Sequence, residues 1–275
     1  MKIVRFRDHA GGMHYGEYVD AQSARRIEGN PFDTYYPTDD VVSVKKLFAP
    51  VEPTTILCIG LNYRLHAEET GAKIPQHPAV FIKAINTLNH PNDPIIIPKV
   101  APGEVDYECE LAVVIKKRGK NIPRHEALDY VLGYTCANDV SARRWQKEGG
   151  GKQWCRGKSF DTFCPLGPCL VTPDDIPNPN DLTIKTILNN ETMQDWTTSD
   201  MIFDVPTLIS FLSESTTLLP GTVILTGTPQ GVGFVRTPPV FLKSGDQVTI
   251  EIERIGALTN PVHEEGERNS IHIHT

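Results

Sequence analysis

A run of apolar and β-branched residues between Val105 and Ile115 predicts a strand at the centre of the fold. Within it, Glu108 and Glu110 stand two residues apart, so both carboxylates lie on one face of the strand. The residues that follow are apolar on both faces, which is typical of a strand buried on both sides. A buried carboxylate without a partner is costly, and a hard cation is the simplest compensation. The alternative is a wet sheet edge where both glutamates are solvated.

Shorter patterns of the same kind place the other elements. Strands are predicted over residues 2–6, 55–59, 79–83, 133–139, 182–188, 222–226 and 248–254, and helices over residues 42–47, 63–69, 124–131, 142–148 and 205–213. Pro50 and Pro53 flank a boundary between a small N-terminal part and the rest of the chain. The element content predicts an α+β chain that is mainly β.

The helix predicted after residue 60 carries a candidate catalytic pair. Asn62 is expected to cap this helix and Gly71 to end it. His66 and Glu69 are three residues apart and therefore share one helix face. Most such pairs are solvated surface contacts. Over a cleft, however, a glutamate that accepts one imidazole proton orients the ring and raises its basicity, as a general base requires.

Further charged residues follow in the next segment. Asp139 is a third carboxylate, at a corner between a strand and a helix, and Ser141 is expected to cap that helix. Arg143 and Gln146 share one face of the same helix. Lys158 comes after a glycine-rich stretch and lies among aromatic and small residues. The structural alternatives are that Asp139 is only a turn residue, that Arg143 faces solvent, and that Lys158 covers apolar surface with its aliphatic stem.

Composition and charge exclude several classes of protein. The 275 residues carry a formal net charge of -7 and no cluster of basic residues, which argues against a nucleic-acid partner. No segment approaches the roughly 18 apolar residues of a membrane span, and the N-terminus lacks the apolar core of a signal peptide. The six cysteines form no C-x-x-C pair, so neither a disulfide framework nor a zinc site is predicted. These features favour a cytoplasmic protein without membrane partners.

Six motifs occur along the chain in a fixed order. They are Gly60–His66, Phe81–Lys83, Tyr107–Leu111, Asn138–Arg143 with Gln146, Gly157–Pro168 and Leu225–Gly233. Together they resemble the fumarylacetoacetate hydrolase family from about residue 53 to the C-terminus. Within it the chain looks most like the members grouped with fumarylacetoacetate hydrolase domain-containing proteins 1 and 2 and with bacterial acylpyruvate hydrolases and isomerases. The resemblance implies a mixed β-roll catalytic domain over residues 53–275, a small N-terminal domain over residues 1–52, and a homodimer.

The same resemblance implies a metal held by Glu108, Glu110 and Asp139. Three carboxylates without a histidine or thiolate suit Mg²⁺ or Mn²⁺, with Ca²⁺ possible, rather than zinc. Magnesium is the expected ion. Such a metal would bind a small 2-oxo acid through its carboxylate and keto or enol oxygens and stabilise an enolate.

Roles for the other residues also come from the resemblance. His66 with Glu69 would act as the general base, and Lys158 as a further catalytic residue. Residues implied in substrate binding are Tyr63, Lys83, Arg143, Gln146 and Thr228. The segment from Asn62 to about Gln76 would form a lid over the substrate. Leu65 and Arg144 depart from the family pattern, because many relatives carry an acidic residue there.

Three reactions share this metal and enolate chemistry. Hydrolysis of a C–C bond in an acylpyruvate needs a base that activates water, and since His66 with Glu69 is such a candidate, hydrolysis is the first prediction. Oxaloacetate tautomerisation or decarboxylation and isomerisation of a 2-hydroxy-dienoate are the alternatives, which fold-level analogy does not separate. A metal-binding module without catalysis is less favoured, because a structural site would not need His66 or Lys158.

Overall fold

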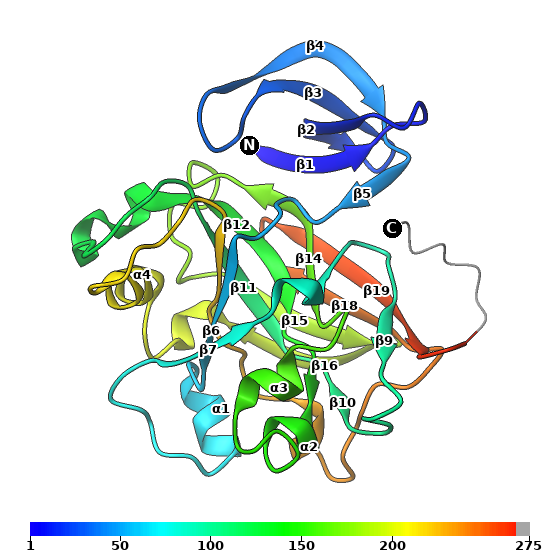
Figure 1. Ribbon diagram of the computed structural model, residues 1–275, viewed down its shortest axis with the longest axis vertical. Helices are drawn as coiled ribbons and strands as arrows, with labels where there is room; N and C mark the ends of the chain where they lie inside the picture. The colour runs from blue at the N-terminus through cyan, green and yellow to red at the C-terminus, as the bar shows by residue number, and fades with distance from the viewer. Residues whose placement is uncertain (268–275) are drawn as a thin grey trace.

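The computed structural model describes residues 1–267, and these form a mainly β molecule with three sheets (Figure 1). The largest sheet has twelve strands in the order β4-β3-β2-β1-β14-β12-β11-β17-β6-β7, with β5 paired to β1 and β8 paired to β14. Its strands are β1 (Lys2–Arg7), β2 (Met13–Asp20), β3 (Ser23–Gly29), β4 (Tyr35–Ser43), β5 (Lys46–Phe48), β6 (Thr55–Gly60), β7 (Ala79–Lys83), β8 (Leu88–Asn89), β11 (Cys109–Ile115), β12 (Val131–Asn138), β14 (Cys164–Val171) and β17 (Thr222–Leu225). The prediction of an α+β chain that is mainly β is confirmed.

The second sheet faces the middle of the first, since β11 and β12 contact β15 and β18 across the core. It has five strands in the order β16-β15-β18-β19-β9, and a third sheet consists of β10 and β13. The strands of these sheets are β9 (Ile95–Ile97), β10 (Val105–Asp106), β13 (Ser141–Ala142), β15 (Thr183–Leu188), β16 (Glu191–Thr197), β18 (Gln247–Ile252) and β19 (Gly256–Glu264). The α-helices are α1 (Arg64–Glu69), α2 (Arg143–Gln146), α3 (Trp154–Lys158) and α4 (Val205–Ser213), and the 3-10 helices are η1 (Ile85–Thr87), η2 (Arg124–Tyr130), η3 (Thr198–Asp200) and η4 (Gly233–Val235).

Strand β11 is buried along its whole length, as its apolar pattern predicted. Leu111, Val113 and Ile115 belong to the core between the two larger sheets. Ala112 and Val114 point the other way, into a second core on the opposite face of the twelve-stranded sheet. Because both faces are covered, the end of this strand is a rigid and dry platform for polar side chains.

The predicted strand over residues 105–115 is not continuous. It breaks between β10 and β11, and Glu108 lies in the link between them. The side chain of Asp106 explains the break, because its Oδ1 accepts a hydrogen bond from the backbone N–H of Tyr107 at 2.9 Å. The backbone N–H of Glu108 in turn donates to Oδ1 of Asn138 at 3.0 Å. Side chains therefore replace ladder hydrogen bonds at the point where the chain turns.

The prediction for the N-terminal part is wrong in its elements. A single strand and a helix over residues 42–47 were expected, but residues 1–48 form five strands. Residues 41–43 pair with β3, and Lys46–Phe48 pair with β1. The valines of this stretch are β-branched and favour an extended backbone, which outweighs its weak helical pattern.

Both predicted helix caps are wrong as well. Tyr63, not Asn62, precedes α1, and the Asn62 side chain instead binds Phe203 and Thr226. Ser141 lies in β13, and its hydroxyl donates to the carbonyl of Asp139 at 2.8 Å. The helix that follows is only one turn long. Other hydrogen bonds, tertiary for Asn62 and local for Ser141, use the polar side chains that the sequence pattern assigns to caps.

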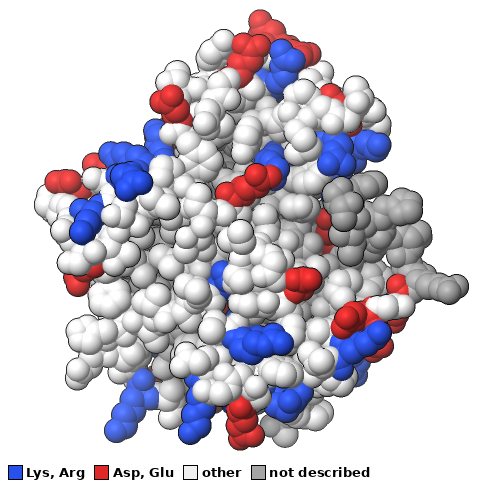
Figure 2. Space-filling model, in the orientation of Figure 1, with Lys and Arg blue, Asp and Glu red and all other residues white. Residues whose placement is uncertain are grey.

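The short helices lie together in the fold. In Figure 1, α1, α2 and α3 gather at the end of the molecule opposite to β1–β4. They contribute side chains to the same cavity as the predicted metal ligands, which lie at the ends of β11 and β12. The face seen in Figure 2 carries acidic and basic side chains interspersed over a largely uncharged surface.

Candidate active site

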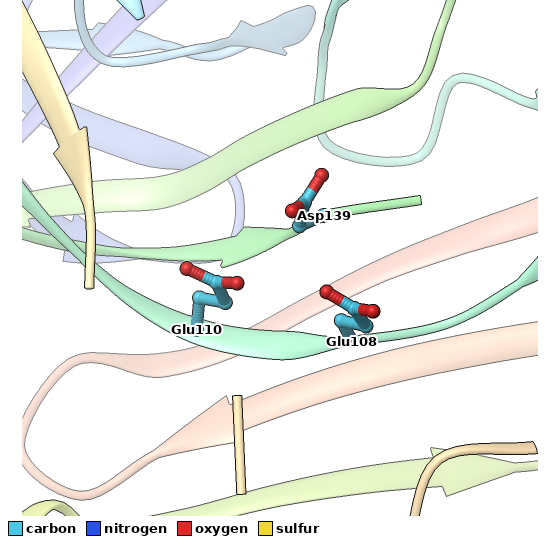
Figure 3. Close-up of side chains that lie close together, drawn as sticks. All are labelled: Glu108, Glu110 and Asp139. Carbon is cyan, nitrogen blue, oxygen red and sulfur yellow. The ribbon is translucent and has the colours of Figure 1, made fainter. Parts of the chain in front are cut away.

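The three predicted metal ligands come together at the end of β11 and β12. Glu110 lies in β11, Glu108 just before it, and Asp139 just after β12. Figure 3 shows the two glutamates on one continuous stretch of chain, on the side that faces Asp139. One carboxylate oxygen from each residue lies within 4.8 Å of the others, and all three residues are buried. The pairing of Cys109 with Asn138 in the ladder sets this geometry.

Two lysines lie against this cluster. The Nζ of Lys158 donates to Oε2 of Glu108 at 2.7 Å and to Oδ2 of Asp139 at 2.6 Å. The Nζ of Lys83 donates to the other oxygen of Asp139 at 2.6 Å and to the carbonyl of Val140 at 3.0 Å. Both lysine side chains are almost fully buried. The site is thus a dry network of charged hydrogen bonds rather than a set of surface ion pairs.

The negative charge of Glu110 has fewer positively charged partners than the charges of Glu108 and Asp139. Its Oε2 accepts a hydrogen bond from the backbone N–H of Gly227 at 2.7 Å. Burial, with the charges of Asp139 and Glu108 beside it, raises the pKa of Glu110 well above its usual value. Burial also raises the pKa of Glu108, but Lys158 and Arg143 outweigh burial and lower it to about 2.

These residues fit a divalent cation. All the donor atoms are carboxylate oxygens, the kind that Mg²⁺, Mn²⁺ and Ca²⁺ prefer. A cation beside Glu110 would supply the positive charge that its environment lacks. Glu108, Glu110 and Asp139 would hold it, and the identity of the metal stays a prediction.

The predicted catalytic pair is in contact. The Nδ1 of His66 lies 2.7 Å from Oε1 of Glu69 on α1. The other carboxylate oxygen of Glu69 accepts a hydrogen bond from the backbone N–H of Gly231 at 2.9 Å. A carboxylate at this distance accepts the Nδ1 proton and leaves Nε2 as the nitrogen available for proton transfer. The pair thus has the geometry of a general base.

A cavity of about 160 Å³ joins these groups. The predicted site residues that line it are His66, Glu108, Glu110, Asp139, Arg143, Gln146, Lys158 and Thr228. Glu69 stands behind His66, and Lys83 stands behind Asp139. Tyr63 does not line the cavity: it is fully buried in the core between the sheets, so direct contact with substrate finds no support in this geometry.

Aromatic residues that the sequence did not indicate form two walls of the cavity. On one side, a Cβ on Gly60 would lie 2.1 Å from the ring of Trp154, so only glycine allows this ring to pack there. On the other side, the Phe234 ring centroid lies 4.4 Å from the guanidinium carbon of Arg143 and 4.7 Å from Nζ of Lys147. The cavity therefore combines apolar surface with cations.

Gln194 holds Thr228 in place. Its Oε1 accepts a hydrogen bond from the backbone N–H of Cys109 at 3.0 Å, which fixes the orientation of the amide. Its Nε2 then donates to Oγ1 of Thr228 at 2.9 Å. Nothing in the local sequence could have indicated this contact, because it joins β16 to a loop 34 residues further along the chain.

Comparison with protein families shows which family the chain belongs to. Residues 55–263 match the profile of the fumarylacetoacetate (FAA) hydrolase C-terminal domain, and residues 1–50 match an N-terminal domain described as Rv2993c-like. The chain belongs to the fumarylacetoacetate hydrolase family. The family and its mixed β fold, both expected from the six motifs, are thereby confirmed. The boundary at residue 52 and the homodimer stay predictions.

Named relatives within the fumarylacetoacetate hydrolase family include tautomerases and isomerases. The mitochondrial oxaloacetate tautomerase fahd2 of Xenopus laevis is 51% identical over 217 residues, which are 78% of this chain and 68% of that protein. The fumarylacetoacetate hydrolase domain-containing protein 2 homolog of Dictyostelium discoideum is 50% identical over 226 residues, 79% of this chain and 74% of that protein. The crystal structure of 2-hydroxyhepta-2,4-diene-1,7-dioate isomerase from Mycobacterium marinum matches with a TM-score of 0.82 and 39% identity, covering 97% of this chain and 100% of that chain.

Two further observations bear on location. Among residues 1–267, no helix has the length and apolar character needed to cross a membrane. The Xenopus laevis relative is named as mitochondrial, so a cytoplasmic location for this chain stays a prediction.

Proposed function

We propose that this chain is a divalent-metal-dependent tautomerase that interconverts the keto and enol forms of a 2-oxo dicarboxylate such as oxaloacetate. The observation that carries the proposal is that the His66 general base and the carboxylate cluster line the same small cavity. The names of the relatives support tautomerisation and isomerisation above hydrolysis, which was the first prediction from sequence.

The reaction needs only proton movement. In the keto-to-enol direction, a proton leaves C3, the C–H electron pair becomes the new C=C bond, and the carbonyl oxygen gains a proton. His66 Nε2 takes the proton from C3 while Glu69 holds the ring and balances its developing charge. Lys158 gives an ammonium proton to the carbonyl oxygen; solvent then reprotonates Lys158 and takes the proton from His66, and the reverse steps convert enol to keto. When bound, the divalent cation would supply Lewis-acid stabilisation of the negative charge on the substrate oxygens.

Charge favours a dianionic substrate. The cluster has four buried carboxylates (Asp106, Glu108, Glu110, Asp139) and three buried cations (Lys83, Arg143, Lys158). A divalent cation would turn this net negative cluster positive. Lys147 then stands over Phe234 at the cavity wall, and no carboxylate lies within ion-pair distance of it among the described residues. We assign the second carboxylate of the substrate to this lysine.

The test is a time course of enol oxaloacetate absorbance with metal-stripped protein, before and after addition of Mg²⁺ or Mn²⁺. We expect the enol to decay faster only with metal and protein together. If metal-loaded protein leaves the decay at the rate of metal in buffer, the proposal is wrong.

Hydrolysis of an acylpyruvate is the second candidate, because the same His66–Glu69 pair would activate water. The fumarylacetoacetate hydrolase from Exiguobacterium antarcticum is a solved relative with a TM-score of 0.82 and 35% identity. Release of pyruvate from an acylpyruvate, with no acceleration of enol decay, would favour this candidate.

A further inference from the structure

Asp106 is a fully buried carboxylate that the proposed chemistry does not use and that does not line the cavity. Its Oδ2 lies 2.8 Å from Nε and 2.7 Å from Nη2 of Arg143. The same oxygen accepts the backbone N–H of Phe234 at 3.0 Å, and Oδ1 accepts the backbone N–H of Gly233 at 2.9 Å and that of Tyr107. One side chain thus ties together β10, α2 and η4.

Two of its partners form the cavity wall. Arg143 directs its remaining nitrogen, Nη1, to Oε1 of Glu108 at 2.6 Å and to Oε1 of Gln146 at 3.0 Å. The ring of Phe234 packs under the guanidinium. Because Asp106 binds the arginine on the side away from Glu108, it determines which edge of the guanidinium faces the cavity.

The chemistry of this contact requires a carboxylate. The hydrogen-bond partners of Asp106 are all donors: three backbone N–H groups and Nε of Arg143, with Nη2 of the same guanidinium at ion-pair distance. An amide in its place would turn one acceptor into a donor that faces other donors, and a buried mismatch of this kind is costly. Residue 233 must in turn be glycine for this approach, since a Cβ added there would lie 2.5 Å from Oδ1 of Asp106.

The neighbouring arginine on α2 provides a matched control. Arg144 is paired with Glu104, with Nη2 at 3.2 Å from Oε1 and the backbone N–H at 3.0 Å from Oε2. This pair joins the same helix to the same segment of chain, two residues before Asp106. Neither Arg144 nor Glu104 lines the cavity.

We infer that Asp106 is a positioning residue for substrate binding: it fixes Arg143 and Phe234 as one wall, and acts on the substrate only through them. The consequence for catalysis rests on the proposed function. The consequence for the wall itself does not, because the hydrogen bonds to Gly233 and Phe234 are independent of any reaction.

The test compares Asp106→Asn with Glu104→Gln in the full-length protein. In Asp106→Asn we expect faster amide hydrogen exchange at Gly233 and Phe234 and a KM for oxaloacetate raised about tenfold or more, with a smaller change in kcat. Glu104→Gln should leave both readouts at wild-type values. Mg²⁺ affinity, measured by calorimetry, should stay within about twofold in both variants, since no metal ligand is altered.

A double-mutant cycle separates positioning from general destabilisation. In an Arg143→Met background, Asp106→Asn should change KM by less than about twofold, because its target is already gone. The inference is overturned if Asp106→Asn raises KM as much in the Arg143→Met background as in the wild type. It is also overturned if amide exchange at Gly233 and Phe234 in Asp106→Asn stays at the wild-type rate. If Asp106→Asn does not fold, Arg143→Lys keeps the charge but loses the two-nitrogen contact and should raise KM in the same way, and a wild-type KM there overturns it equally. If the wild type has no tautomerase activity but Asp106→Asn still exchanges faster at Gly233 and Phe234, the role of Asp106 in the wall stands. Only the proposed function is then refuted.

Discussion

In the proposed reaction, proton transfer depends on the contact between His66 and Glu69 on α1. If His66 is the base and Glu69 orients it, His66→Ala should lower kcat by about 10² to 10⁴, and Glu69→Gln by less. Since neither residue belongs to the carboxylate cluster, Mg²⁺ affinity should be retained. Steady-state kinetics and calorimetry on the same preparations measure both quantities. Loss of metal binding together with activity would contradict the assigned role.

In the proposed function, a single residue, Lys147, binds the second carboxylate of the substrate. Lys147→Met should raise KM for oxaloacetate about fivefold, because the lysine is exposed and solvent screens its interaction. KM for a monoanionic 2-oxo acid should change little. Lys152→Met is the matched control, since Lys152 is also exposed on the same stretch but does not line the cavity. Equal effects of both variants, or equal effects on both substrates, would argue against the assignment.

The two glutamates and the catalytic pair were accessible from sequence because each pair is local, whereas Asp139 joined the metal ligands through the family resemblance. The glutamates alternate along one strand, and His66 and Glu69 share a helix face, so fixed periods bring them together. Asp106 and Phe234 were not accessible in this way. They meet across 128 residues of chain, and only the folded arrangement of β10 beside η4 reveals the contact.

At the scale of elements, α1 is held by an unusual anchor. Asn62 donates to the carbonyls of Phe203 and Thr226 and accepts the N–H of Phe203. Leu61, just before it, has a φ of 53°, a region that suits glycine better than leucine. The anchor therefore holds the helix of the catalytic pair against two other loops.

Replacing this anchor should affect both stability and catalysis. Asn62→Ala leaves buried backbone groups without partners, which should cost about 1–3 kcal/mol in urea unfolding. It should also lower kcat, because α1 loses its fixed position over the cavity. Asn86→Ala removes an exposed amide that binds Asp161 and should stay within about 0.5 kcal/mol of wild type. An Asn62→Ala protein with wild-type stability would contradict the anchoring role.

Sequence patterns found elements with strong and simple periodicity, such as β7, β15 and α4, and missed those whose composition opposes their structure. β14 is a central strand, yet it contains Pro165 and Pro168, which are typical of edges and loops. The strands β2, β3, β16 and β19 are held by pairing with the strand next to them in the chain, which their own apolar pattern does not show. The cap at Asn62 was wrong because tertiary partners bind its side chain, and the cap at Ser141 because its hydroxyl binds the carbonyl of Asp139, two residues before it.

For the whole molecule, the carboxylate cluster links stability to pH and metal. Burial, with two neighbouring carboxylates, raises the pKa of Glu110 above its ordinary value of 4.5. The folded state then binds more protons than the unfolded state from about pH 4.5 upward to the raised pKa. In that window the metal-free protein should lose stability as pH rises.

Glu110→Gln isolates this effect, since every other titrating group is common to both proteins. The free energy of unfolding of the metal-free wild type should fall relative to that of Glu110→Gln as pH rises above 4.5. Added Mg²⁺ should reverse the trend in the wild type by binding the ionised carboxylate. Denaturant titrations at several pH values provide the measurement. Parallel profiles for the two proteins would show that Glu110 is not perturbed.

The N-terminal strands belong to the same twelve-stranded sheet as the strands that carry the site. β1 pairs with β14, and β14 with β12, the strand that leads to Asp139. Ile3 and Ile27 pack in the same core as Ala112 and Val114 of β11. Residues near the N-terminus thus support the strand that carries Glu110.

The most direct test of the proposed activity presents enol oxaloacetate and an acylpyruvate side by side to one preparation, metal-stripped and then loaded with Mg²⁺, while enol decay, carbon dioxide and pyruvate are measured. A tautomerase accelerates enol decay only when metal is present and releases neither carbon dioxide nor pyruvate above background. Metal-dependent pyruvate release from the acylpyruvate, or carbon dioxide release from oxaloacetate, without faster enol decay would contradict the proposed function.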